Sequence, residues 1–316
     1  MASDALLSRA VVIDTDPGID DALAILLALQ SPELEVLGIS TVHGNVPLST
    51  TTRNAFRILH LAGRLDIPVY RGAERPLSRE PYDAAEVHGS DGLGGVDLAD
   101  PGDAPRGDAV SFLIQTLRDR AGEVDLVCLG PLTNLALAEQ AAPGILSRAR
   151  RVLAMGGAVD EPGNVTPTAE FNFFADPDAA RAVILSGSPL ALVPLDVTHR
   201  VTLDDVHLEG AADTAQGRFV VQSVSACMDR AERILGIRQF HLHDPLAVGA
   251  AIDPAVCTYE RVWLDVETRG ALTAGQVVAD RRPVAEEAQR RGLPCDCAMR
   301  VDAERFLSVI KQRLLR

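Results

Sequence analysis

Short apolar segments alternate with longer helix-forming segments along most of the chain. Strands are expected at residues 10–14, 34–41, 67–70, 124–129, 150–155 and 190–195. Helices are expected between them, near residues 21–30, 49–62, 108–120, 133–141 and 177–186. Apolar strands that alternate with helices indicate βαβ units, a parallel sheet and right-handed crossovers. The pattern therefore predicts an α/β fold with an open, mostly parallel sheet flanked by helices.

Four regions depart from this alternation. Residues 72–107 are rich in Gly, Pro and Asp and predict a long loop, which in a compact domain usually carries function. Residues 202–242 predict a more polar helical insertion, residues 256–282 a small antiparallel addition, and residues 302–316 a closing helix. Because we find no repeat, low-complexity tract or linker, we expect a single domain over residues 1–316.

An acidic segment lies between the first strand and the first helix. It reads Asp14-Thr15-Asp16-Pro17-Gly18-Ile19-Asp20-Asp21. Four carboxylates so close repel one another, and some would have to take up protons unless a cation binds. Oxygen ligands favour Ca²⁺ or Mg²⁺ over zinc. A single Asp could serve as a helix N-cap, but a helix needs only one cap. The segment therefore predicts a metal site.

Further short motifs follow this segment along the chain. They are Thr41-Val42-His43-Gly44-Asn45, His88-Gly89-Ser90-Asp91-Gly92-Leu93-Gly94-Gly95, Leu129-Gly130-Pro131-Leu132-Thr133-Asn134, Met155-Gly156-Gly157, Gly163-Asn164, Glu170-Phe171-Asn172 and His243-Asp244-Pro245. In kind and order they resemble the motifs of the nucleoside hydrolases, the N-ribohydrolases that cleave inosine and uridine. The resemblance covers most of the chain. It implies a Rossmann-like domain that hydrolyses the N-glycosidic bond of purine and pyrimidine ribonucleosides.

The resemblance also implies which residues form the site. Ca²⁺ would be held by Asp16, Asp21, the Leu129 carbonyl and Asp244. Asp16 would be the general base for the metal-bound water, and His243 is the first candidate for the acid that protonates the leaving base, ahead of His88 and His241. The ribose hydroxyls would be bound by Asp20, Asn45, Asn164, Glu170, Asn172 and Asp244, and Met155 and His88 would complete the substrate-binding set.

Residue chemistry is consistent with these roles. Carboxylates accept hydrogen bonds and amides both donate and accept them, which suits vicinal hydroxyls. Negative groups beside the ribose would stabilise an oxocarbenium-like transition state. Glu170 and Asn172, two residues apart, would lie on one side of an extended segment. The base is expected to contact residues 202–242, where the candidates are Arg230, Arg233, Arg238, Gln239 and Phe240.

Composition restricts the partners and the compartment. The formal charge of −14 argues against nucleic acid or an anionic membrane as a partner. The partner that the resemblance implies is a small-molecule ribonucleoside. No apolar run approaches the roughly 20 residues that span a bilayer, and the first residues lack a secretory pattern. Five cysteines are an odd number for a disulfide framework, so we expect a cytoplasmic protein. The resemblance further implies a homodimer or homotetramer and a role in nucleoside salvage.

Two other functions stay open at this point. An aspartate-nucleophile phosphatase would use Asp14, but it needs a Lys beside the phosphate, and the only Lys is Lys311 near the C-terminus. A catalytically silent protein that binds a nucleoside or Ca²⁺ is the second alternative. The pair Cys295 and Cys297 could bind zinc, although no second pair or His cluster accompanies it.

Overall fold

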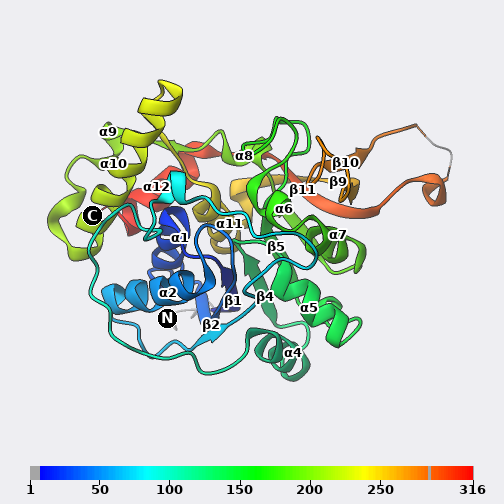
Figure 1. Ribbon diagram of the computed structural model, residues 1–316, viewed down its shortest axis with the longest axis horizontal. Coiled ribbons are helices and arrows are strands. Elements are labelled where there is room, and N and C mark those ends of the chain that lie inside the picture. Colours follow the sequence, from blue (N-terminus) through cyan, green and yellow to red (C-terminus); the bar gives the residue numbers. More distant parts are fainter. Residues whose placement is uncertain (1–7, 284–285, 316) are drawn as a thin grey trace, which may run out of the picture.

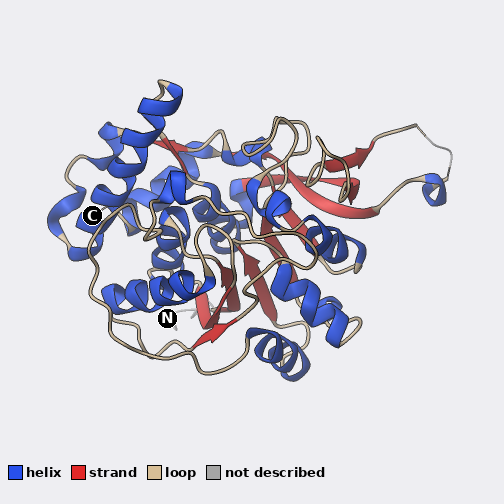
Figure 2. Ribbon diagram, viewed as in Figure 1, coloured by secondary structure: helices blue, strands red, loops and turns tan. Residues whose placement is uncertain are grey.

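The computed structural model describes residues 8–283 and 286–315. Within them, one sheet has nine strands in the order β10-β9-β11-β6-β5-β4-β1-β2-β3 (Figures 1 and 2). The strands are β1 (Arg9–Thr15), β2 (Leu34–Thr41), β3 (Val69–Arg71), β4 (Val124–Cys128), β5 (Arg151–Met155), β6 (Leu190–Val193), β9 (Cys257–Val266), β10 (Val277–Asp280) and β11 (Leu293–Val301). All pairs from β3 to β11 are parallel, whereas β9 pairs antiparallel with both β11 and β10. The predicted α/β fold is thus confirmed.

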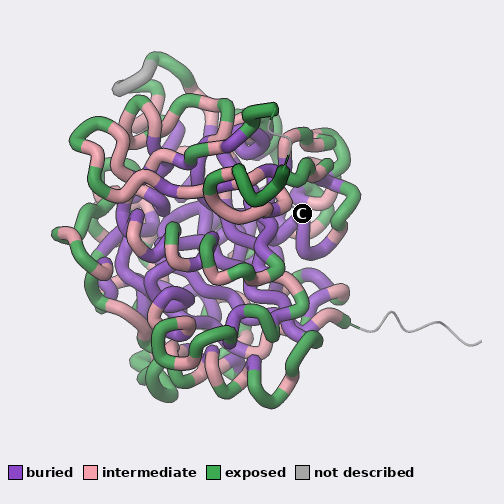
Figure 3. The backbone as a smooth tube through the Cα atoms, turned by 90° about the vertical axis from the view of Figure 1, so that its right-hand side faces the viewer, coloured by how far each residue is buried: buried purple, intermediate pink, exposed green. Residues whose placement is uncertain are grey.

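Helices cover both faces of the sheet. They include α1 (Ile19–Leu29), α2 (Leu48–Ala62), α4 (Ala109–Asp119), α5 (Thr133–Ala141), α7 (Pro177–Leu185), α11 (His243–Ile252) and α12 (Ala303–Arg313). One apolar core holds residues of α1, α2, α11 and α12, and the other holds residues of α4, α5 and α7. The strands between the two helix layers are buried along most of their length (Figure 3). Burial on both faces explains why these strands are continuously apolar in sequence.

The strand order reverses beside β1. The chain runs from β1 to β2 and β3 on one side and then crosses to β4 on the other side of β1. Ligands of open parallel sheets bind outside the carboxyl ends of the strands at such a reversal. The acidic segment follows β1 directly, so the fold brings it to this position.

The regions outside the βα alternation contain more structure than the pattern predicted. Residues 202–242 form α9 (Asp205–Leu208), a 3₁₀ turn η2 (Ala211–Asp213) and α10 (Ala215–Leu235), but also two short antiparallel strands, β7 (Thr202–Leu203) and β8 (Phe240–His241). The predicted long loop contains α3 (Ala85–His88). The antiparallel addition continues the main sheet through β11. In the described part of the chain, no helix has the length and apolarity to cross a membrane.

Candidate active site

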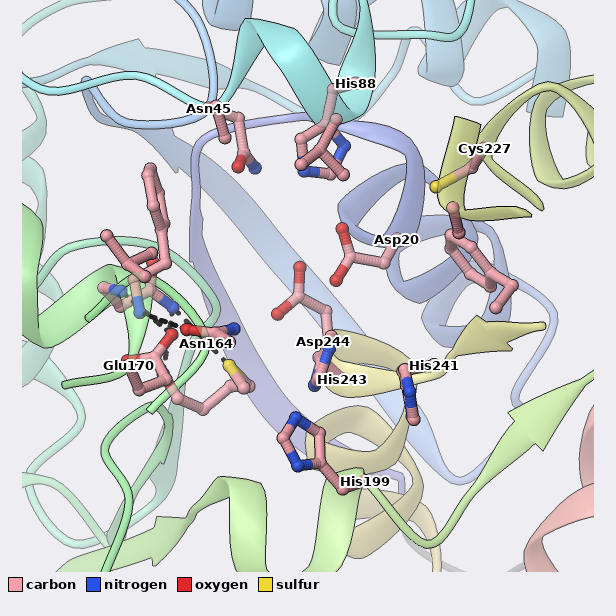
Figure 4. A pocket seen from close by; sticks show the side chains of 18 of the residues that line it. Asp20, Asn45, His88, Asn164, Glu170, His199, Cys227, His241, His243 and Asp244 are labelled. Atoms are coloured by element: carbon pink, nitrogen blue, oxygen red, sulfur yellow. Dashed lines mark hydrogen bonds between the residues drawn. The ribbon is translucent and has the colours of Figure 1, made fainter. Parts of the chain in front are cut away.

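A cavity of about 640 Å³ lies at the carboxyl ends of the parallel strands. Eleven of the residues predicted to hold the metal, bind the substrate or transfer a proton line it, namely Asp20, Asn45, His88, Leu129, Met155, Asn164, Glu170, Asn172, His241, His243 and Asp244. In Figure 4, Asp20 and Asp244 lie at its centre, Asn164 and Glu170 on one side, and Cys227 and His241 on the other. This size is typical of a small-molecule site. Segments far apart in sequence therefore converge on one pocket, as the strand pattern predicted.

Three carboxylates gather at the floor of the cavity, where Asp20 and Asp244 line it and Asp21 lies fully buried behind them. Oxygens of Asp20, Asp21 and Asp244 all lie within 4.8 Å of one another. They meet because α1 packs against α11, and each helix presents its acidic residues in its first turn. Burial raises the pKa of Asp20 to about 6 and, together with the charges of neighbouring aspartates, raises the pKa of Asp244 well above its usual range. Some of these carboxylates would therefore take up protons unless a cation binds, as the sequence predicted.

Asp21 is held rigidly by its surroundings. It accepts hydrogen bonds from the Thr15 hydroxyl, from the Gly18 amide at 3.0 Å and from Asn45 Nδ2 at 2.9 Å. The N-cap of α1 is Gly18, so no Asp of the segment is the N-cap; Asp21, at the third position of the helix, supports the helix start by accepting from the Gly18 amide. Asn45, predicted to bind ribose, thus also orients a carboxylate of the floor.

Asp16 lies behind the floor and does not line the cavity within the described residues. Its Oδ2 accepts from the Asn45 amide at 2.7 Å, whereas its Oδ1 is buried without a hydrogen-bond partner. A Cβ at Gly44 would be 1.9 Å from Oδ2, and one at Gly130 would be 2.4 Å from Oδ1. Both motif glycines therefore leave room for this carboxylate. Burial, reinforced by the charge of Asp21, raises the pKa of Asp16 well above its usual range.

Asp14 is committed to the protein interior. Its Oδ1 accepts from Asn134 Nδ2 at 2.7 Å and from the Ser40 hydroxyl, and burial raises its pKa to about 7. Asp14 does not line the cavity, and Lys311 lies on α12, away from it. This arrangement does not provide the exposed nucleophile and phosphate-binding Lys of a phosphatase.

Glu170 and Asn172 meet at one side of the cavity, but the expected extended segment is wrong. Glu170 is the N-cap of a short helix, α6 (Phe171–Ala175), because its carboxylate accepts from the amides of Asn172 and Phe173 at 2.9 and 3.2 Å. Asn172 Nδ2 then donates to the carbonyls of Leu129 at 2.7 Å and Met155 at 3.1 Å. Burial raises the pKa of Glu170 to about 7. Nearby, Asn164 Oδ1 accepts from the Phe171 amide at 3.0 Å.

Four imidazoles, those of His88, His199, His241 and His243, also line the cavity. His88 Nδ1 accepts from the Ile19 amide at 3.1 Å, so its proton is on Nε2. His243 Nδ1 lies 2.8 Å from the Thr198 hydroxyl, and its ring centroid is 5.5 Å from that of His241. Burial lowers the pKa of His88 and of His241 to about 4. Burial also holds the pKa of His243 well below its usual range. The rings of His88, His241 and His243 are therefore neutral near pH 7.

Not every base-contacting candidate reaches the cavity. Arg230, Gln239 and Phe240 line it, whereas Arg233 and Arg238 do not. Arg233 donates to its own helix, and Arg238 pairs with Asp205, Asp229 and Glu232 at the surface. The sequence analysis missed His199 and Cys227, which also line the cavity. His199 follows α8 (Leu195–Thr198), which separates it from the end of β6, so the rule that placed polar residues directly after strand ends did not reach it.

The parallel sheet and the acidic pocket at its strand reversal define an α/β protein with a small-molecule site at the carboxyl ends of its strands. The model of the family "Inosine-uridine preferring nucleoside hydrolase" matches residues 11–308. The chain therefore belongs to this family, whose members are glycosidases that act on ribonucleosides.

Named relatives agree with this assignment. A pyrimidine-specific ribonucleoside hydrolase from Salmonella typhimurium is 39% identical, with 98% of this chain and 99% of the relative covered. A plant nucleoside hydrolase has a similar structure, with a TM-score of 0.91, 36% identity, and 97% and 99% of the two chains covered. A purine-preferring ribonucleoside hydrolase from Gardnerella vaginalis gives a TM-score of 0.90, 32% identity, and coverage of 97% and 98%.

Proposed function

We propose that this protein is a Ca²⁺-dependent ribonucleoside hydrolase that releases free base and ribose. The observation that carries the proposal is the cluster of Asp20, Asp21 and Asp244 at the floor of a cavity whose sides bear amides and a further carboxylate. The Salmonella relative is named for pyrimidine substrates and the Gardnerella protein for purine substrates. Because the ribonucleoside is common to both names, we propose purine and pyrimidine ribonucleosides as substrates.

The residues present fit a hard cation. Asp16 Oδ1 is buried without a partner, and neighbouring carboxylates have raised pKa values, which is the state that a divalent cation relieves. Asp16, Asp21, the Leu129 carbonyl and Asp244 would hold it. Asn172 already donates to the Leu129 carbonyl, whose second lone pair is left for a ligand. When bound, Ca²⁺ would neutralise the carboxylates and make water easier to deprotonate.

The chain's own residues would carry the other steps. Asp16 takes the proton of the attacking water. Asp20, Asn45, Asn164, Glu170, Asn172 and Asp244 bind the ribose hydroxyls. The carboxylates among them stabilise the positive charge that develops on the sugar. His243 is the proposed proton donor to the departing base, and its low pKa leaves only its neutral N–H for that task near pH 7. A homodimer or homotetramer, a cytoplasmic location and a role in nucleoside salvage remain predictions.

The test is release of reducing sugar from uridine, cytidine, inosine and adenosine. The protein is assayed as purified, after treatment with EDTA, and after Ca²⁺ is restored. We expect hydrolysis that EDTA abolishes and Ca²⁺ restores, together with binding of Ca²⁺ to the metal-free protein in calorimetry. Calcium and nucleoside binding without any hydrolysis would instead indicate the silent binding protein. Full activity in EDTA would refute the calcium dependence.

A further inference from the structure

The cavity carries unequal charges at its two ends. Asp20, Glu170 and Asp244, all buried, make the floor and one side acidic, whereas the carboxylate at the His88 end belongs to Glu86, an exposed residue of α3. Among the described residues that line the cavity, Arg230 on α10 is the single Arg or Lys. A cation in a partly enclosed site stabilises negative charge that develops near it during a reaction. The attraction is stronger than in bulk water, because the protein surroundings screen the two charges less.

A backbone carbonyl orients the Arg230 side chain, and its guanidinium makes no ion pair with the described carboxylates. Its Nη1 donates to the Val87 carbonyl of α3 at 3.2 Å, and a Cβ at Gly89 would lie 3.1 Å from its Nη2. None of the carboxylates in the described ranges lies within ion-pair distance of it, although Arg238 in the same region is paired with three. Its charge helps, after burial, to lower the pKa of His88. The guanidinium therefore acts at the His88 end of the cavity.

The base of a bound nucleoside has to occupy this end. The ribose is assigned to the side that holds Asn164 and Glu170, above the floor at Asp244 (Figure 4). What remains for the base is the part lined by His88, Arg230 and the β8 segment. When the N-glycosidic bond breaks, its electron pair stays on the ring nitrogen, so the departing base becomes negative in this part of the cavity.

We propose that Arg230 contacts the base and stabilises the negative charge that develops on it as the bond to C1′ breaks. This inference rests on the proposed function. As the C1′–N bond breaks, the water oxygen bonds to C1′ and the electron pair of the broken bond goes to the base. Asp16 takes the water's proton, the proposed donor His243 protonates the base, and solvent returns the proton from Asp16 to His243 as products leave. Arg230 stays protonated throughout and acts through its charge and its N–H donors.

The experiment compares leaving groups that differ in their need for stabilisation. Uracil and hypoxanthine are poor leaving anions, whereas p-nitrophenolate leaves readily from p-nitrophenyl β-D-ribofuranoside. We expect Arg230→Gln to lower kcat/KM for uridine and inosine by about 10- to 100-fold, and for the nitrophenyl riboside by less than about 3-fold. Arg230→Lys, which keeps the charge, should recover part of the loss on both nucleosides.

Arg233→Gln is the matched control, because it removes the same charge from α10 outside the cavity. It should leave all three substrates within about twofold of wild type. An equal loss on all three substrates in Arg230→Gln would mean that Arg230 only holds α3, and no loss would mean that it does not contact the base. Either result overturns this inference alone. A wild-type protein that cleaves none of the substrates overturns the proposed function as well.

Discussion

The two ends of the cavity differ in how their side chains are held. At the sugar end, Glu170 accepts from three backbone amides and Asn172 donates to two carbonyls, all between elements of the main fold. At the base end, Arg230, Gln239 and His241 come from the insertion and are partly exposed. Groups fixed by the scaffold suit a reaction that never changes, whereas groups on an added segment can differ between proteins that share the reaction.

The largest effect should come from Asp16, because it is both the proposed general base for the attacking water and a proposed ligand of the metal. We expect Asp16→Asn to lower kcat by at least about 10⁴-fold, because loss of a general base alone typically costs 10²–10⁴-fold. Asp125→Asn is the control, since Asp125 is equally buried, 1% exposed as Asp16 is, but pairs with Arg150 away from the cavity. Near-normal kcat in a folded Asp16→Asn protein would exclude the role.

Asn172→Ala should weaken recognition of the ribose without changing how the base is bound. We expect kcat/KM for uridine and inosine to fall by roughly 100-fold, with a smaller fall for their 2′-deoxy forms. Asn54 is a matched control, because it is a buried amide that donates to two carbonyls outside the cavity. Asn54→Ala should leave the ratio of ribo to deoxy activity unchanged. The same fall for both sugars in Asn172→Ala would show that Asn172 is only structural.

Because Glu170 and Asp20 are buried, the folding stability of the metal-free protein should depend on pH. The folded protein holds Glu170 at a pKa of about 7 and Asp20 at about 6, above their ordinary values of 4.5 and 3.8. Between about pH 4 and 7 the folded state therefore binds more protons than the unfolded state, and stability falls as pH rises. In EDTA we expect Tm to drop by roughly 5–10 °C between about pH 5 and pH 8.

Calcium should reverse this trend, since it replaces the protons on the acidic cluster. Ca²⁺ is therefore expected to raise Tm more at about pH 8 than at about pH 5. Differential scanning calorimetry at both pH values, with and without Ca²⁺, makes the measurement. A Tm in EDTA that increases over this range would contradict the pKa shifts.

The smallest effect should come from Gln239, a neutral side chain at the base end. Gln239 lines the cavity and lies 3.4 Å, Nε2 to Nε2, from His241. Loss of one neutral hydrogen bond in Gln239→Leu should change the ratio of uridine to inosine activity by about 3- to 10-fold. Gln216→Leu, on the same insertion but outside the cavity, should change nothing. A larger effect on the ribo-to-deoxy ratio than on the base ratio would place Gln239 at the sugar end instead.

The sequence predicted the scaffold better than the added segments, for physical reasons. Strands buried on both faces are continuously apolar, so β1 and β2 were predicted to within one residue. Asp16 and Asn45 follow the ends of these strands, which meet at one edge of a parallel sheet. Their convergence could therefore be inferred without any tertiary information.

Elsewhere the predictions from sequence were wrong or incomplete, because side-chain capping and the rotation of a helix about its axis cannot be inferred from the local residues. Glu170 starts a helix by accepting from amides within that helix, and the local residues alone suggested an extended segment. Arg230 and Arg233 are three residues apart on α10, yet only Arg230 lines the cavity. Which of them does so depends on how the helix is rotated against α3, and tertiary packing decides that rotation. His199 was missed because the segment after β6 contains a short helix that separates it from the strand end.

The central claim is that groups at the sugar end require a ribose, whereas the base end accepts more than one base. Four kcat/KM values for the wild-type protein test it most directly, with uridine, inosine, 2′-deoxyuridine and 2′-deoxyinosine as substrates. Buried groups that lose a hydroxyl partner discriminate by about 10⁴-fold or more, so removal of the 2′-hydroxyl should cost far more than exchange of the base. Equal activity on the ribo and deoxy forms would contradict the ribose assignments and the proposed ribohydrolase activity.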